Sequence, residues 1–111
     1  MKTREKVIQI LNDAKEMGQN GVNQFKKDFN DSPSHALIWS QNVFEAQSKV
    51  EVATYLLDRI ERCEISIFYS SLTKEVLERA QRRNGSTMST SNLFEEFKTM
   101  AYAQILDRLT P

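Results

Sequence analysis

Apolar residues recur every three or four positions along most of this chain, which is the spacing of helices that bury one face. The first stretch begins near Thr3, whose hydroxyl can cap a helix, and Gly18 is a typical stop signal. A shorter apolar stretch follows over about 22–30, so we expect two helices joined at Asn20-Gly21. The apolar stripe of the first helix consists of Val7, Ile10, Leu11, Ala14 and Met17.

Between Pro33 and Gly85 the chain contains neither glycine nor proline, the two residues that most often interrupt helices. Pro33 itself is typical of a helix start. We therefore predict one long central helix over about 33–69, with a break or kink near Ser70-Ser71. The alternative is a break near Glu61–Glu64 that folds the chain back within a monomer. Apolar residues of the helix step by four and three, as in a heptad seam, through Trp39, Val43, Ala46, Val50, Ala53, Leu57 and Ile60.

Residues 64–69 (EISIFY) fit two patterns. Apolar residues alternate with other residues here, as in a strand, but apolar residues at every third or fourth position also continue a helical stripe. The sequence offers no partner strand, so helix is favoured. Two further helices are expected, from about Thr73 to Asn84-Gly85 and from Asn92 onward. The fold class is therefore an all-α bundle of four to five helices, organised around the long central helix in a single domain, residues 1–111. The apolar seam of the last helix is Phe94, Phe97, Ala101, Ile105 and Leu109.

Lys plus Arg and Asp plus Glu both number 15, so the formal net charge is zero. This balance gives no electrostatic reason to expect a nucleic acid or an anionic membrane as partner, and it removes the self-repulsion that opposes association. No apolar run approaches the ~20 residues of a membrane span, and the N-terminus lacks the apolar core of a secretion signal. A single cysteine, Cys63, fits a reducing compartment. We expect a cytoplasmic protein that needs no cofactor.

The long helix predicts a partner. About 29 helical residues span about 43 Å, which exceeds the roughly 34 Å diameter of a compact chain of this size. Further apolar residues lie far round the helix from the seam, so its second side needs cover. The leading functional hypothesis is an interaction module that forms a homo-oligomer, most simply a dimer, or binds a protein partner. Its expected interface consists of Trp39, Val43, Val50, Leu57 and Ile60.

Carboxylates at helical spacing suggest an alternative function. Glu61 and Glu64 precede the expected kink and Glu75 and Glu78 follow it, and facing Glu-x-x-Glu pairs are how all-α enzymes hold Mg²⁺. This spacing resembles the helical nucleotide pyrophosphatases of the MazG type, which pair Glu-x-x-Glu with Glu-x-x-Asp. The second element here, Glu75-Val-Leu-Glu78, departs from that pattern. The resemblance implies a metal-dependent nucleotide hydrolase, whereas a solvated face paired with nearby cations is the other interpretation.

A third functional hypothesis is a small apolar ligand bound between helices. Trp39, Phe44 and Tyr55 are large side chains with alanines nearby, and such a mixture can leave an aromatic pocket. The alternative is an interdigitated core or interface.

The remaining residues that could have a chemical role are not expected to form a functional site. His35, the single histidine, has no second imidazole or thiolate to share a metal and is read as a surface residue. Cys63 is read as a small buried hydrophobe, because its position late in a helix disfavours a thiolate. Arg79, Arg82 and Arg83 are read as cations that complement a helix C-terminus rather than as part of a DNA-binding motif.

Overall fold

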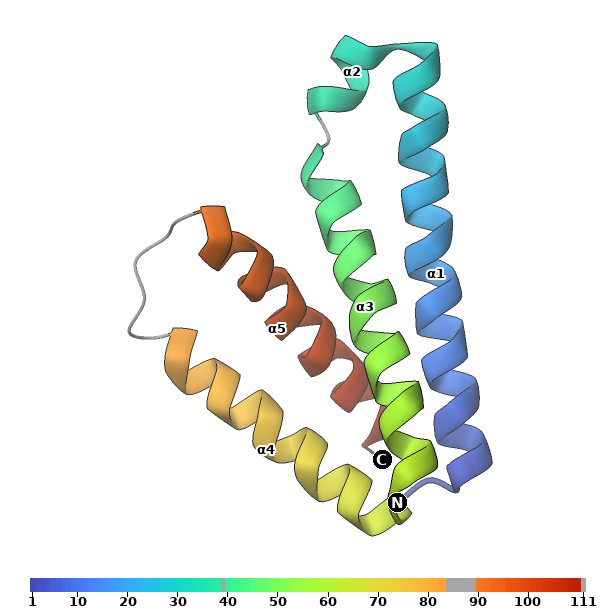
Figure 1. Ribbon diagram of the computed structural model, residues 1–111, viewed down its shortest axis with the longest axis vertical. Helices are drawn as coiled ribbons and strands as arrows, with labels where there is room; N and C mark the ends of the chain where they lie inside the picture. Colours follow the sequence, from blue (N-terminus) through green and yellow to red (C-terminus); the bar gives the residue numbers. More distant parts are fainter. Residues whose placement is uncertain (39, 84–89, 111) are drawn as a thin grey trace.

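The computed structural model describes residues 1–38, 40–83 and 90–110, apart from the side chains of Arg83 and of residues 90–93. This part of the chain forms five helices and no strand, so the all-α bundle is confirmed. The helices pair as two hairpins, α1 with α3 and α4 with α5 (Figure 1). Their bounds are α1 (Arg4–Asp31), α2 (Pro33–Ile38), α3 (Ser40–Arg62), α4 (Ile65–Arg83) and α5 (Thr90–Leu109).

The first helix, α1, is continuous over 28 residues and is the longest of the described helices. Thr3 caps it as predicted, since its Oγ1 accepts a hydrogen bond from the Lys6 amide at 3.3 Å. The predicted stop at Gly18 and the predicted joint at Asn20-Gly21 are wrong, because both glycines face α3. A Cβ at Gly18 would lie 2.7 Å from the carbonyl oxygen of Ala46, and one at Gly21 would lie 2.8 Å from the Ala46 Cβ. The glycines therefore permit close helix packing rather than ending a helix.

The span 33–69, predicted as one helix, is divided among three helices. Short α2 ends at Ile38 and α3 begins at Ser40, while Trp39 lies outside the described residues. Helix α3 ends at Arg62, and the turn at 63–64 folds the chain back, as the alternative interpretation proposed. The helix predicted over 64–69 is confirmed from Ile65, where α4 begins, but the break predicted at Ser70-Ser71 is absent, since α4 continues to Arg83.

The end of α3 is held by a side chain from a distant part of the chain. The guanidinium of Arg4, in α1, donates to the carbonyl oxygen of Ile60 and, at 2.7 Å, to that of Cys63. The last carbonyls of a helix lack intrahelical donors, and a cation there also complements the helix dipole. Arg4 therefore stabilises a helix end that neither glycine nor proline marks.

The last helix, α5, contacts α1, α3 and α4, and its predicted stripe of Ala101, Ile105 and Leu109 is buried. It begins at Thr90, two residues before the predicted Asn92, and the expected helix end at Asn84-Gly85 lies outside the described residues. The core that α5 closes includes Leu11, Ala53, Leu56, Ile60, Phe68, Leu72 and Tyr102.

Both chain ends lie beside the α3–α4 turn (Figure 1). The hydroxyl of Tyr69 accepts a hydrogen bond from the Lys2 amide at 3.1 Å and donates one to the Leu109 carbonyl at 3.0 Å. One α4 side chain thus ties the start of α1 to the end of α5.

Candidate functional site

Helices α3 and α4 diverge from the turn that joins them, and α5 lies between them in Figure 1. Residues of these three helices line a cleft of about 220 Å³. Its base is apolar, because Leu56, Leu72 and Tyr102 are almost completely buried. Around this base stand a second phenol and four charged side chains. The complete lining is Tyr55, Leu56 and Arg59 from α3, Ser71, Leu72, Lys74, Glu75 and Glu78 from α4, and Tyr102 from α5.

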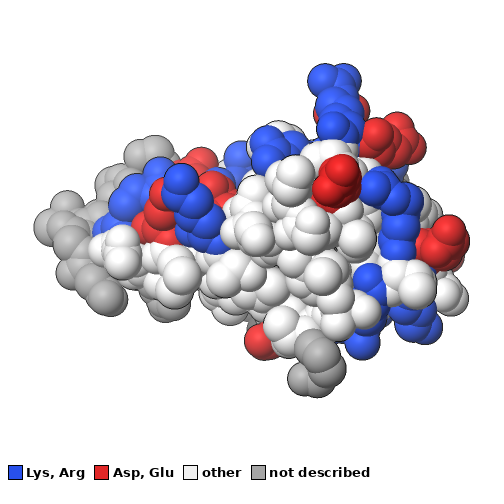
Figure 2. Space-filling model, turned by 90° about the horizontal axis from the view of Figure 1, so that it is seen from below, with Lys and Arg blue, Asp and Glu red and all other residues white. Residues whose placement is uncertain are grey.

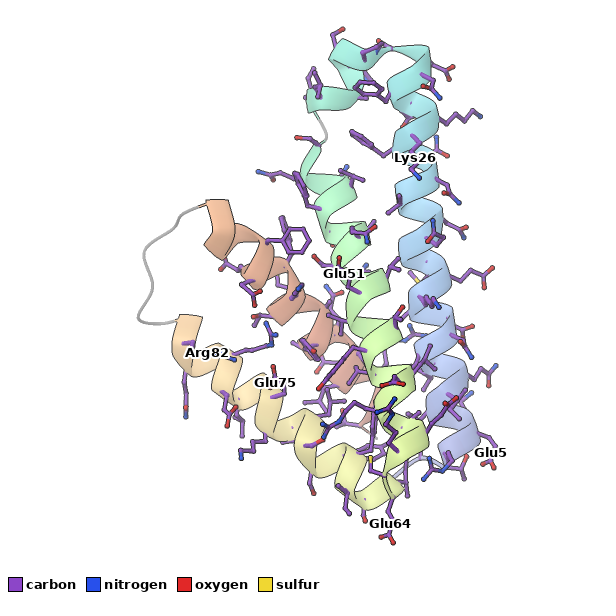
Figure 3. All side chains as sticks on the ribbon, in the orientation of Figure 1. Glu5, Lys26, Glu51, Glu64, Glu75 and Arg82 are labelled. Atoms are coloured by element: carbon purple, nitrogen blue, oxygen red, sulfur yellow. The ribbon has the colours of Figure 1, made fainter. Side chains whose placement is uncertain are left out.

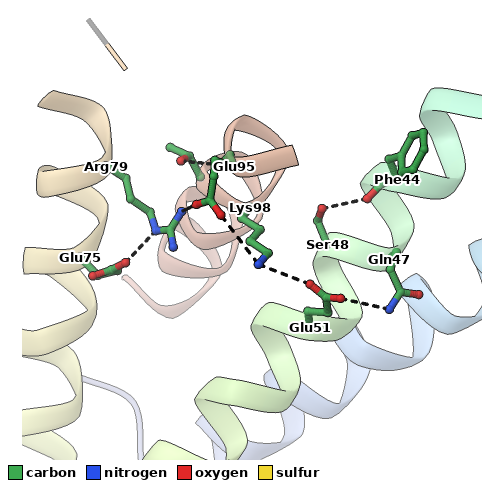
Figure 4. Close-up of polar contacts among 9 residues, drawn as sticks. Phe44, Gln47, Ser48, Glu51, Glu75, Arg79, Glu95 and Lys98 are labelled. Carbon is green, nitrogen blue, oxygen red and sulfur yellow. Dashed lines mark hydrogen bonds and ion pairs between the residues drawn. The ribbon is translucent and has the colours of Figure 1, made fainter. Parts of the chain in front are cut away.

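A chain of ion pairs runs beside the cleft from α4 through α5 to α3 (Figure 4). The guanidinium of Arg79 lies 2.7 Å from a Glu75 carboxylate oxygen and 3.1 Å from one of Glu95. The ammonium of Lys98 lies 3.9 Å from Glu95 and 3.5 Å from Glu51. The side chain of Arg79 is only 14% exposed, so its ion pairs are screened less by solvent than the Lys98–Glu51 pair that joins α5 to α3, in which the Glu51 side chain is 42% exposed.

Arg79 also lies over the ring of Tyr102, with its guanidinium carbon 4.6 Å from the ring centroid. Burial alone would lower the pKa of Arg79, but hydrogen bonds to Glu75 and Glu95 outweigh it and the pKa is raised above its ordinary value. Burial raises the pKa of Tyr102, and the charge of Arg79 offsets this only in part. At neutral pH the base of the cleft therefore presents a neutral phenol beside a charged arginine with two carboxylate partners.

Arg59 differs from the other charged residues of the cleft. Its Nη2 donates to the Ser71 hydroxyl at 3.1 Å, but no carboxylate of the described residues lies within ion-pair distance of its guanidinium. By contrast, Glu75 pairs with Arg79, and Glu78 lies 3.8 Å from the Lys74 ammonium. Among the described residues, Arg59 is thus the cation of the cleft lining that has no counter-charge.

The four glutamates proposed for metal binding are not brought together. Glu75 points toward α5 and lines the cleft with Glu78, whereas Glu64 points away from the molecule at its lower end (Figure 3). Glu61 is also exposed at the α3–α4 turn. Within the described residues no three His, Cys, Asp or Glu side chains form a group that could hold a metal ion. The pairs with Lys74 and Arg79 match the solvated-face interpretation instead.

The residues predicted as a dimer interface pack largely within the chain. Ile60 is fully buried and Leu57 packs against the core. Val50 contacts α1 at Gly18, where an added Cβ would lie 2.9 Å from its Cγ2. Val43 is partly buried, and Trp39 lies outside the described residues. The heptad seam therefore does mark a helix–helix contact, but the contact that the structure shows is the one between α3 and α1.

The residues predicted to form an aromatic pocket are separated. Tyr55 lines the cleft, whereas Phe44 packs edge-on against Phe94 of α5 with ring centroids 6.2 Å apart. Trp39, the third, is outside the described residues.

The cleft itself was missed because its walls come from three helices. One local signal does point to Arg59. The positions three and four residues from it in the chain hold Tyr55, Leu56, Arg62 and Cys63, so no carboxylate can pair with it along the helix. Arg62, by contrast, has Asp58 at 3.4 Å.

The end of the bundle formed by α2 exposes several apolar side chains. Leu37 and Ile38 of α2 are 59% and 71% exposed, and Phe29 at the end of α1 and Phe44 at the start of α3 are 41% and 45% exposed. Apart from His35, no residue from 32 to 44 carries an ionisable side chain. We call this surface, made of Phe29, Leu37, Ile38 and Phe44, the α2 end.

The opposite end also has a broad area without charged side chains (Figure 2). Here α4 begins with an uncharged stretch over 65–73, and a shallow hollow is lined by Ser66, Ile67, Ser70, Ser71 and Lys74. Ile67 is the large apolar residue of that hollow and is 53% exposed. The α2 end therefore offers more apolar surface than this hollow does.

The remaining candidates have ordinary environments. His35 is exposed on α2, and Cys63 is half-buried, with its Sγ donating to the Arg59 carbonyl at 3.3 Å. Arg79 is turned toward α5 and Arg82 is exposed, while the Arg83 side chain lies outside the described part of the structure. The predicted basic cluster is thus divided by the ion pairs of Arg79.

No helix within the described ranges is long and apolar enough to cross a membrane. Comparison with protein-family models, with curated proteins and with solved structures finds no match to this chain.

Proposed function

We propose that this chain is a helical interaction module that self-associates through the α2 end. The observation that supports this is the exposure of Leu37 and Ile38 on α2, together with that of Phe29 at the end of α1 and Phe44 in the first turns of α3. Single exposed apolar residues are ordinary on a protein surface, whereas several at one end of a molecule are typical of a contact surface.

A second copy of the chain is the partner that best suits this surface. Residues 32–44 carry no formal charge when His35 is counted as neutral, so contacts between the α2 helices of two copies bring no like charges together. The charged residues nearest to this stretch are Asp31 before it and Glu45 after it. The whole chain also has a formal net charge of zero, so long-range repulsion does not oppose the approach of two copies. A strongly charged partner would gain nothing from this surface.

The expected association is weak. Full burial of a Leu, Ile or Phe side chain is worth about 1.5–3 kcal/mol, and the four side chains are roughly half exposed, so each contributes on the order of 1 kcal/mol in each copy. Association itself costs roughly 4–15 kcal/mol. The two terms are of similar size, which predicts a dimer that forms and dissociates with concentration rather than a permanent one.

The test is the solution mass of the wild type and of Leu37→Glu/Ile38→Glu, measured by sedimentation from about 10 μM to about 1 mM, the range in which weak dimers form. The wild-type mass should rise above the 12.9 kDa of one chain as concentration increases, while the double variant stays at 12.9 kDa. Both side chains are more than half exposed, so the variant should keep its helical circular dichroism.

The matched control is Ile67→Glu, which makes the same kind of change at a 53% exposed residue at the other end of the bundle. It should associate like the wild type. A wild type that stays monomeric throughout, a double variant that still associates, or an Ile67→Glu variant that dissociates would each refute self-association through the α2 end. A cytoplasmic location stays a prediction, based on the single cysteine.

A further inference from the structure

We propose that the cleft between α3, α4 and α5 binds a small monocarboxylate with an aromatic or apolar body, whose carboxylate pairs with Arg59. This site is separate from the α2 end and does not depend on self-association. Three features of the cleft support it: a cation without a carboxylate partner among the described residues, the remaining hydrogen-bond donors of that cation and an apolar base.

The lining is neutral as a whole, with Arg59 and Lys74 against Glu75 and Glu78, but one of its two cations has no carboxylate partner among the described residues. Each carboxylate of the lining already faces a cation, Glu75 at 2.7 Å from Arg79 and Glu78 at 3.8 Å from Lys74. Arg59 faces no carboxylate within ion-pair distance among the described residues. A cation that is half withdrawn from water gains from a counter-ion, and a ligand with a single negative charge would supply it.

The network of Figure 4 does not provide that charge to Arg59. It contains three carboxylates and two cations, so it has a surplus negative charge. Its α3 member is Glu51, eight residues from Arg59, or about 12 Å along the helix, which exceeds the ~8 Å screening length at physiological salt. Glu51 is also exposed and already paired with Lys98 at 3.5 Å.

The donors are positioned for a carboxylate. Arg59 carries five N–H groups in a planar fork, and one of its nitrogens donates to the Ser71 hydroxyl at 3.1 Å. The remaining donors can bind both oxygens of a carboxylate, the geometry in which arginine pairs most strongly. A second negative charge on the ligand would instead meet the carboxylates of Glu75 and Glu78.

The body of the ligand is set by the size and base of the cleft. A volume of about 220 Å³ is below that of sites for drug-sized molecules, roughly 300–1,000 Å³, so the ligand is small. Leu56 and Leu72 at the base are 4% and 2% exposed, and Tyr55 and Tyr102 provide aromatic rings. A flat ring packs well against such walls.

Phenylacetate is a suitable probe, and phenylacetamide is its neutral counterpart of nearly the same shape. Titration of ¹⁵N-labelled protein followed by NMR should show binding of phenylacetate with a dissociation constant of about 0.1–1 mM, and much weaker binding of phenylacetamide. The largest shifts should fall on Arg59, Ser71 and Tyr102. Arg59→Gln should weaken phenylacetate binding at least about tenfold, because a hydrogen bond to a charged group is lost.

Arg62→Gln is the matched control, since it removes the same charge three residues away on α3 from a side chain that is 76% exposed and paired with Asp58. It should leave binding unchanged. Absence of phenylacetate binding at about 10 mM, equal binding of phenylacetamide, or an equal loss in Arg62→Gln would overturn the proposal. The shift map of the wild type is an independent test should Arg59→Gln fail to fold, because shifts that centre away from the cleft would also overturn it.

Discussion

Gly21 of α1 faces the Cβ of Ala46 in α3, so an alanine at this position tests how closely the two helices pack. On an open helix face, replacing glycine by alanine stabilises a helix by about 0.8–1.0 kcal/mol. At Gly21 the new Cβ would lie 2.8 Å from the Ala46 Cβ. Carbon atoms in contact are normally about 3.5–4.0 Å apart, and a Cβ cannot rotate away from its own backbone.

Two opposing terms therefore decide whether Gly21→Ala raises or lowers the free energy of unfolding. Overpacking of this kind costs about 1–3 kcal/mol, and the gain in helix propensity returns about 1 kcal/mol. We expect Gly21→Ala to lower the free energy of unfolding by about 1 kcal/mol. For a domain of this size that corresponds to a decrease in Tm of about 4–8 °C.

A double-mutant cycle separates the cost of the close contact between residues 21 and 46 from the gain in helix propensity. Ala46→Gly alone should cost about 1 kcal/mol, since it places glycine inside α3. In that background the atom that opposes the new Cβ is gone, so Gly21→Ala should raise stability by about 1 kcal/mol instead of lowering it. The expected coupling is about 2 kcal/mol, which urea unfolding followed by circular dichroism at 25 °C can measure.

Gly18→Ala is the comparison variant. A Cβ at Gly18 would meet the carbonyl oxygen of Ala46 at 2.7 Å, and that oxygen is present whatever side chain residue 46 carries. Gly18→Ala should therefore destabilise the protein in both backgrounds. The reasoning fails if Gly21→Ala stabilises the wild type by about 1 kcal/mol, as it would on an open face, or if Ala46→Gly leaves its effect unchanged.

Three further predictions concern the contacts that fix the ends of the helices and the base of the cleft. Arg4→Met should lower the free energy of unfolding by about 1.5–3 kcal/mol in urea denaturation, because the last carbonyls of α3 lose a charged donor, whereas Lys6→Met on the exposed face should change it by less than about 0.5 kcal/mol. Tyr69→Phe should cost about 0.5–1.5 kcal/mol and should speed amide exchange near both chain ends, and unaltered exchange there would contradict the role given to its hydroxyl. Because the pKa of Tyr102 is raised, its stabilising contribution should be complete below pH about 10 and lost as pH rises through the folded-state pKa; absorbance titration should show one late tyrosine step that Tyr102→Phe abolishes.

Several elements follow directly from local sequence. Thr3 caps α1 because a hydroxyl at that position satisfies a free amide, a contact that involves only residues three apart. The stripe of Ala101, Ile105 and Leu109 is buried as its spacing predicts, since a helix with one apolar side must cover it. The same holds for residues 64–69, where the absence of a partner strand favoured helix.

Other features were decided by contacts between distant residues. The period of the seam on α3 shows that something packs there, but it is the same whether the partner is α1 or a second chain. The glycines at 18 and 21 carry the same local signal as helix stops, and only their position against Ala46 shows that they make room for a neighbour. The end of α3 depends on Arg4, more than fifty residues away in the chain.

The sequence by itself thus determined that most of the chain is helical and where the apolar stripe of α5 lies, because both depend on groups one or two turns apart. Only the tertiary structure decided where the helical stretch over 33–69 breaks, what covers the apolar seam of α3 and which charges remain without partners. Those outcomes depend on distances between helices. Arg59 illustrates both levels, since the sequence shows that no carboxylate lies within helical reach and only the fold shows that none arrives from α4, α5 or elsewhere in the described residues.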